Sequence, residues 1–241
     1  PFDMATLGSR STFHMGHAVR RASEDARDKL LALAQEVGVS VETTPIREVF
    51  RKKYGMQAGN IIGSGTFVPA STPTDHETGQ SANVTPFWMI GATGVEVEVD
   101  TETGRVTVTR LINVADLGRP INPDIVESQL SGAAIMQLGF TMSEKMEFNA
   151  GACTNPSLAD YKIPGMLDIP IGIENEAVDA EQGSGPFGAK GVGESGTFGV
   201  SPAVANAIED AVGVRITSLP ITSEAVYRAL RAKQGNPLKD N

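Results

Sequence analysis

Two runs of alternating apolar and polar residues, separated by a turn, are the strongest structural signal in this sequence. The first run extends from Gly94 to Asp100, and the second from Arg105 to Leu111, with a continuation toward Ala115. Residues 101–104 between them have the composition of a tight turn. Successive side chains of a strand point to opposite faces, so this pattern predicts a β-hairpin with one buried face.

Helical signals lie on both sides of the hairpin. Apolar residues spaced three and four apart predict one long helix near the start of the chain. The helices that we expect cover residues 15–37, 44–53, 123–137, 201–212 and 223–233.

Two of these helices have start signals of their own. Pro123 follows Asn122, and Pro202 follows Ser201, which we expect to be the cap of its helix. Residues 55–86 and 148–190 show little periodicity and are expected to be irregular, the first as a long excursion without packed structure. Helices mixed with a hairpin, without βαβ alternation, favour an α+β fold with mixed or antiparallel strands and long helices.

Composition excludes several classes of function. The net charge is −9, from 20 basic and 29 acidic residues, which argues against nucleic-acid binding. Cys153 is the one cysteine, so the chain cannot form an internal disulfide, a four-cysteine zinc site or an iron–sulfur cluster. No apolar run approaches 18 residues, so no membrane span is expected. These features favour a reducing compartment, and we expect the cytoplasm.

The densest glycine cluster covers residues 183–199, where seven of seventeen residues are Gly and one carboxylate, Glu194, stands among small residues. One interpretation is a surface loop with a solvated glutamate. The other is a backbone-lined pocket in which a partly desolvated Glu194 acts as a general base. The cluster lacks the spacing of a P-loop and matches a dinucleotide-binding motif poorly.

Two further stretches could form polar sites. Residues 8–12 (GSRST) precede the long helix and suit an anion such as phosphate, unless Thr12 or a neighbour only caps that helix. Residues 116–123 (DLGRPINP) with Gln129 could build a site at a helix start, or only form turns and caps. The histidines, His14, His17 and His76, lack the spacing of a metal site.

Read together, these stretches resemble the molybdenum hydroxylases, the family of xanthine dehydrogenase and aldehyde oxidase. The last segment of that family contains, in order, VDxETG, DxGRxINP, a Gln six residues on, YKIP and GxKGxGE. This sequence has VDTETG at 99–104, DLGRPINP at 116–123, Gln129, YKIP at 161–164 and GAKGVGE at 188–194. One departure is Met136-Gln137, where many relatives have Gln-Gly, and its effect on a pterin contact is left open.

The resemblance implies roles for particular residues. Glu194 matches the glutamate that acts as the general base in hydroxylation. The residues that match cofactor-binding positions are Gly8, Ser9, Ser11, Thr12, Gln129, Gly191, Val192 and Gly193. The pterin dithiolene holds the metal in this family, so no side chain is expected to be a metal ligand.

The resemblance also implies cofactors and partners. We expect molybdopterin with molybdenum, carried as the pterin alone or as its cytosine dinucleotide, and 2Fe–2S clusters and FAD on partner chains only. Residues 1–241 would then be the C-terminal portion of a molybdopterin-binding region within a larger assembly. The chain opens at Pro1 without a starting methionine, which suggests a fragment, a processed chain or a split subunit.

The activity implied is hydroxylation of an aldehyde or an N-heteroaromatic C–H, with water as the oxygen source and a small molecule as substrate. Three alternatives stay open: a non-catalytic structural subunit of such a complex, a member of the CO dehydrogenase type, and a plain ligand-binding module. The last predicts that the purified complex contains no molybdenum.

Overall fold

The computed structural model describes residues 5–57, 59–180 and 184–238, which form two compact units. The helical unit contains residues 10–87 and the part of the glycine cluster up to Gly191, and the sheet unit contains residues 7–9, 88–180 and the chain from Val192 onward. Residues 5–6 also belong to the helical unit, so the chain passes between the units five times, including once on each side of residues 7–9 and once within the glycine cluster.

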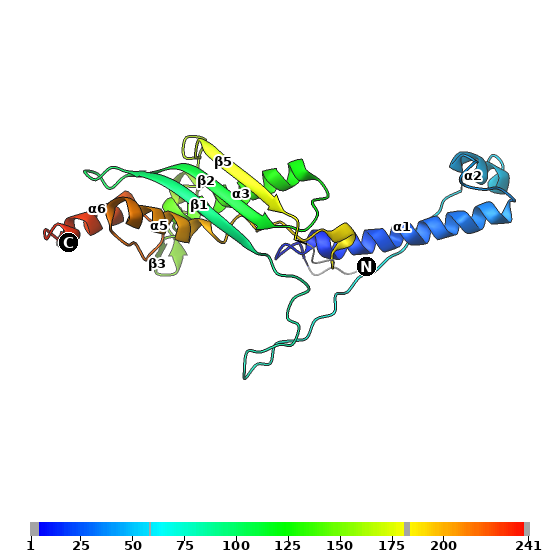
Figure 1. Cartoon of the computed structure of the whole chain (residues 1–241), viewed down its shortest axis with the longest axis horizontal. Coiled ribbons are helices and arrows are strands. Elements are labelled where there is room, and N and C mark those ends of the chain that lie inside the picture. Colours follow the sequence, from blue (N-terminus) through cyan, green and yellow to red (C-terminus); the bar gives the residue numbers. More distant parts are fainter. Residues whose placement is uncertain (1–4, 58, 181–183, 239–241) are drawn as a thin grey trace. The chain divides into compact units, whose positions relative to one another are not determined.

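The helical unit is built on α1 (Ser11–Glu36) and α2 (Ile46–Tyr54), which packs near the C-terminal end of α1 (Figure 1). Leu33, Ala34 and Val49 form the buried centre of this small core. The long helix predicted over 15–37 is confirmed but begins four residues earlier. Arg10 is its N-cap residue, without a side-chain cap, so the interpretation of Thr12 as the cap is wrong.

The excursion at 55–86 contains no helix or strand among its described residues, but its first part is packed, contrary to our expectation. This part, the 59–67 segment, runs back along α1 (Figure 1). Asp25 accepts a 2.7 Å hydrogen bond from the Ser64 N–H, and Lys29 donates to the Ile62 carbonyl oxygen at 2.9 Å. At Gly63 a Cβ would lie 1.9 Å from the Ala22 carbonyl oxygen, so the segment needs glycine to approach the helix.

The sheet unit contains a mixed sheet in the order β1-β2-β5. The predicted hairpin is confirmed as β1 (Gly91–Val99) and β2 (Val106–Asp116), which pair antiparallel. The register shifts between Glu96 and Val97, as a β-bulge does. Because of this shift, Val108 and Leu111 are both buried although they are three positions apart on β2. Arg110 stays on the exposed face.

The third strand was missed by the sequence interpretation. β5 (Gly172–Val178) lies inside the stretch expected to be irregular and pairs parallel with β2. The connection between them runs through α3 (Pro123–Met142), so the fold contains one βαβ crossover that we did not expect.

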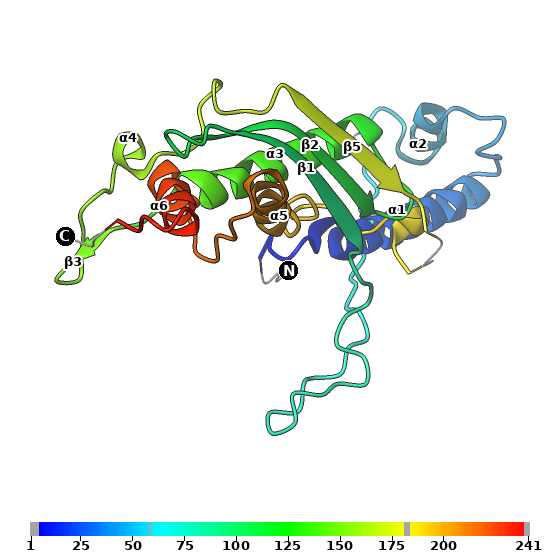
Figure 2. The same cartoon turned by 60° about the vertical axis from the view of Figure 1, so that its left-hand side comes forward.

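Two helices, α3 and α5 (Val200–Val212), cover one face of this sheet (Figure 2). Leu111, Leu138 and Val204 are buried between the sheet and these helices. α6 (Ser223–Lys233) follows, and Leu230 extends the same core. The shorter elements are β3 (Phe148–Asn149), β4 (Ala152–Cys153), α4 (Leu158–Tyr161) and the 3-10 helix η1 (Pro186–Gly188), which belongs to the helical unit.

The helix start at Asn122 is confirmed, because its side-chain oxygen accepts from the Ile125 N–H with Pro123 in the first turn. The cap assigned to Ser201 is wrong: Gly199 precedes α5, without a side-chain cap. The Ser201 hydroxyl instead lies 2.7 Å from the hydroxyl of buried Thr141, and it accepts from Gln137 at 2.8 Å. The hydroxyl is used to join α3 to α5.

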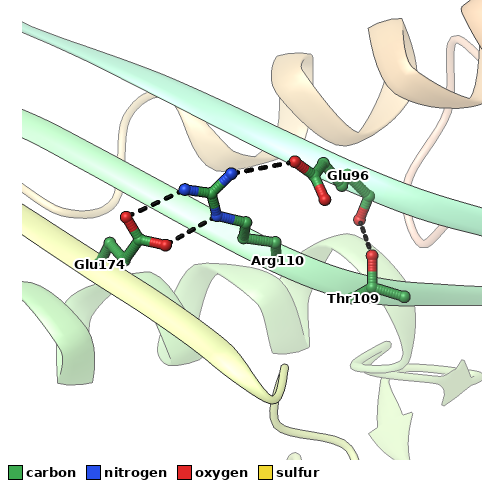
Figure 3. A network of polar contacts seen from close by, with 4 residues as sticks. All are labelled: Glu96, Thr109, Arg110 and Glu174. Atoms are coloured by element: carbon green, nitrogen blue, oxygen red, sulfur yellow. Dashed lines mark hydrogen bonds and ion pairs between the residues drawn. The ribbon is translucent and has the colours of Figure 1, made fainter.

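The exposed face of the sheet carries one ion-pair network that joins all three strands (Figure 3). Arg110 on β2 donates to both carboxylate oxygens of Glu174 on β5, at 2.7 and 3.0 Å. It also donates to Glu96 on β1 at 3.1 Å. Hydrogen bonding to Arg110 lowers the pKa of Glu174 below its ordinary value, and the two carboxylates raise the pKa of Arg110.

The VDTETG turn is fixed by its own acid and by the helix packed against it. Asp100 accepts from the Thr103 hydroxyl and from the Glu102 N–H, which lowers the pKa of Asp100. Gly104 has φ +75°, and a Cβ there would lie 2.2 Å from the carbonyl oxygen of Ser223 in α6. Only glycine fits both the turn and this close packing.

Candidate functional site

Glu194 lies in a run of consecutive turns, residues 193–199, that ends where α5 begins. Its backbone is held on both sides. The Glu194 N–H donates a 2.9 Å hydrogen bond to Ser9 Oγ, and its carbonyl oxygen accepts from Thr197 Oγ1 at 2.8 Å. The role of Thr197 was missed in the sequence. A hydroxyl residue three positions after Glu194 is a local signal for such a side-chain hydrogen bond to the backbone.

The Glu194 side chain itself is exposed. In this chain the carboxylate is therefore solvated, as in the first of the two interpretations, and not partly desolvated, as in the second. The physical reason is that nothing in the described part of the sheet unit covers the turn at Glu194, whereas the next residues, Ser195 and Gly196, are buried. What this chain supplies is a carboxylate on a fixed backbone, open to whatever molecule binds there.

The residue before Glu194 is held as well. Gln129 in α3 donates from Nε2 to the Gly193 carbonyl oxygen at 2.6 Å. A Cβ on Gly193 would lie 3.5 Å from Cα and Oγ of Ser9, so the two backbones are close neighbours. Gly8 and Ser9 both have left-handed backbone, with φ 56° and 58°. This conformation turns the stretch toward residues 193–199, which we call the glutamate loop.

The glutamate loop is anchored on the helix behind it. At Gly196 a Cβ would lie 2.5 Å from the Leu130 carbonyl oxygen of α3. Val192 packs on the cluster formed by Ala115, Leu117 and Leu130. Ser195 is buried, and its hydroxyl donates to Met89 Sδ at 3.3 Å. The loop is thus a packed element, unlike a mobile surface loop.

The structure brings together only some of the candidate residues. Glu194, Gly193, Val192, Gln129, Ser9 and Gly8 belong to the sheet unit. Ser11, Thr12 and Gly191 belong to the helical unit. Ser11 and Thr12 open α1, whose first turn has neither a side-chain cap nor an acidic residue. Free N–H groups at such a helix start suit an anionic group.

The remaining polar candidates have structural roles. Asp116 is buried and accepts from the Gly118 N–H at 3.1 Å, as in an Asx turn. His17 is buried, stacks on Phe67 and lies 2.8 Å from the Ser184 carbonyl oxygen. Gln137, at the position that departs from many relatives, donates to Ser201 between two helices.

Within residues 5–57, 59–180 and 184–238, no group of three His, Cys, Asp or Glu side chains could hold a metal ion. No helix in those ranges is both long and apolar enough to cross a membrane. Cys153 is a free, half-buried thiol.

Within the sheet unit, a carboxylate on a backbone held by Ser9 and next to a residue bound by Gln129 is consistent with the resemblance noted above. The family model for the molybdopterin cofactor-binding domain matches residues 1–170. This chain belongs to that family. The match includes Ser9 and Gln129, whereas Glu194 lies beyond its end.

Relatives agree with this assignment. Probable hypoxanthine oxidase XdhD of Escherichia coli (strain K12) is 33% identical over 95% of this chain. The large subunit of nicotine 6-hydroxylase of Paenarthrobacter nicotinovorans is 30% identical, also over 95%. This chain covers only 24% and 30% of the two relatives, respectively.

A solved structure agrees with the fold of this family member. The aldehyde oxidoreductase from Desulfovibrio desulfuricans ATCC 27774 superposes with a TM-score of 0.78 at 28% identity. The match covers 95% of this chain and 24% of that protein. The resemblance to the xanthine dehydrogenase and aldehyde oxidoreductase family, and the expected mixed helix and strand fold, are therefore confirmed.

Proposed function

We propose that this family member is the cofactor-binding part of a molybdenum hydroxylase, and that Glu194 is its general base. In the reaction, R–H and H₂O give R–OH, two protons and two electrons. The substrate class is an aldehyde or an electron-poor N-heteroaromatic compound. The observation that carries the proposal is the fixed Glu194 backbone, held by Ser9 on one side and Thr197 on the other.

The residues present fit a phosphate-bearing pterin. Ser9, Ser11 and Thr12 offer hydroxyl donors, and α1 offers uncapped N–H groups at its start. Gln129 lies beside the glutamate loop, where its amide can also contact a pterin edge. The chemistry that the cofactor supplies when bound is acceptance of the two electrons at molybdenum. We leave both pterin forms, with and without the cytosine nucleotide, within the proposal.

Glu194 would take up one of the two protons. A carboxylate is suited to this task when its position relative to the reacting oxygen is fixed, and its basicity rises when a bound ligand excludes water. The glycine on its N-terminal side leaves space for a ligand to approach the carboxylate closely. Burial of Glu194 would thus come from the rest of the site and not from this chain.

Further cofactors belong on partner chains in this proposal. The electrons must leave the site, and Cys153 as the one cysteine cannot hold a 2Fe–2S cluster. Partner subunits with 2Fe–2S clusters and FAD would carry the electrons onward. A free, half-buried thiol fits a cytoplasmic enzyme complex, which is the location that we propose.

Three measurements on the native complex test this function. We expect stoichiometric molybdenum and a pterin in the purified complex, and turnover of aldehydes or N-heterocycles with an artificial electron acceptor. In water labelled with heavy oxygen, the product should carry the label. A complex without molybdenum would refute the proposal and favour a structural or ligand-binding role, and oxidation of carbon monoxide alone would favour the CO dehydrogenase-type alternative.

A further inference from the structure

Ser9 is placed to act on Glu194 as well as on a cofactor. The two residues are 185 positions apart in sequence, yet Ser9 Oγ accepts the Glu194 N–H at 2.9 Å. The hydroxyl is thus used as an acceptor, and within the described residues its own proton has no partner. A serine hydroxyl can accept and donate at the same time.

The backbone of Ser9 is specialised for this contact. Its φ of 58° is left-handed, which few non-glycine residues adopt. A glycine would take this conformation at lower cost, but it would have no hydroxyl to accept the Glu194 N–H. The close approach of Gly193, whose Cβ would be 3.5 Å from Ser9, leaves the hydroxyl directed at the glutamate loop.

We propose that Ser9 is a positioning residue that holds the glutamate loop in a fixed position relative to a bound cofactor. Its oxygen holds the Glu194 amide, and its proton is donated to an anionic oxygen of the cofactor. A ligand that orients the Ser9 hydroxyl therefore also fixes the base. This inference rests on the proposed function.

The experiment uses the purified complex with Ser9→Ala and Ser9→Gly. Both remove the acceptor, but Ser9→Gly relieves the left-handed backbone, so their shared effects report the hydroxyl. Ser40→Ala is the control, because Ser40 Oγ likewise accepts a backbone N–H, from Glu42 at 3.2 Å, in the helical unit. The readouts are molybdenum content, kcat and KM per molybdenum, and amide hydrogen exchange of the peptide spanning residues 192–199.

In both Ser9 variants we expect faster amide exchange at Glu194, with or without cofactor. We also expect kcat per molybdenum to fall about 10- to 100-fold with little change in KM, since small displacements of a catalytic group are costly. Ser40→Ala should change none of these. Wild-type exchange, or faster exchange with wild-type kcat per molybdenum, would overturn the positioning role, as would loss of activity explained entirely by loss of molybdenum.

Glu194→Gln in the same complex distinguishes failure of the proposed base from failure of the positioning role of Ser9. If Glu194→Gln is inactive while both Ser9 variants keep wild-type kcat, the base stands and the positioning role fails. If Glu194→Gln is fully active, the proposed base fails. Amide exchange then still decides whether Ser9 holds the loop, because that readout does not depend on turnover.

Discussion

Gln129 in α3 donates a 2.6 Å hydrogen bond to the carbonyl oxygen of Gly193, the residue immediately before Glu194. The resemblance to the family assigns this glutamine to the pterin. Its amide also reaches the glutamate loop, so one side chain is placed to contact both the loop and a bound pterin. Variants of Gln129 should therefore affect turnover through the position of Glu194, in addition to any effect on cofactor retention.

Gln129→Glu tests this contact with almost no change in shape. A carboxylate cannot donate to the Gly193 carbonyl oxygen, so we expect turnover per molybdenum to fall, by up to about 100-fold if the loop moves by about 1 Å. Steady-state kinetics with metal analysis measure this. Ser128→Ala is the control, because within the described residues the Ser128 hydroxyl bonds only to the Asp124 carbonyl oxygen of its own helix. Unchanged turnover in Gln129→Glu would show that the contact is unimportant for catalysis.

The close packing of Gly196 on α3 predicts a stability effect. Gly196→Ala would place a Cβ 2.5 Å from the Leu130 carbonyl oxygen, and overpacking of this kind costs about 1–3 kcal/mol. Gly132→Ala on the same helix is the control. Apart from its chain neighbours and the nearby backbone of its own helix, no atom lies within 4 Å of the added Cβ, and an exposed helical glycine replaced by alanine should add about 0.5–1 kcal/mol. Thermal unfolding that ranks the two variants in the opposite order would contradict this account.

The hydroxyl pair between α3 and α5 predicts a non-additive effect. Ser201→Ala leaves buried Thr141 and the Gln137 amide short of a partner, at a cost of about 1–3 kcal/mol. The double variant Ser201→Ala/Thr141→Val removes both hydroxyls, and we expect it to cost less than the sum of the single variants. Denaturant unfolding of all three measures the coupling. Strict additivity would mean that the two hydroxyls do not interact.

The Arg110 network predicts a pH effect on the sheet. Hydrogen bonds from Arg110 lower the pKa of Glu174 in the folded protein below its ordinary value of 4.5. Its contribution to stability is therefore complete above that pH and is lost as the pH falls through the lower, folded-state pKa. Glu174→Gln should flatten the acid limb of the stability profile, and added salt should weaken the wild-type effect.

Glu176→Gln is the control for this measurement. Glu176 lies on the same strand and forms no ion pair within residues 5–57, 59–180 and 184–238. If Glu176→Gln changed the acid limb as much as Glu174→Gln, the effect would come from net charge and not from the pairing with Arg110.

The parts of the fold that depend on local pattern could be predicted from the sequence. The hairpin was found because alternation over β1 and β2 needs only neighbouring residues, and α1 because its apolar face repeats along one helix. β5 was missed because it contains only two β-branched residues, Ile173 and Val178, and because its partner strand is distant in sequence. Parallel pairing leaves no turn signal between the strands.

The candidate site could be predicted as residue types but not as contacts. Ser9, Gln129 and Glu194 were identified from short motifs, yet nothing local indicates that Ser9 binds the Glu194 amide or that Gln129 binds Gly193. The exposure of Glu194 was also not predictable, since burial depends on what covers a loop, and glycine content alone does not determine it.

The most direct test of the central claim is turnover of Glu194→Gln in the native complex, with molybdenum and pterin measured on the same preparation. The amide keeps the size of the side chain but cannot act as a base. We expect cofactor content near that of the wild type and turnover lower by about 100- to 10,000-fold. A Glu194→Gln complex that is fully loaded with cofactor and fully active would contradict the assignment of Glu194 as the base.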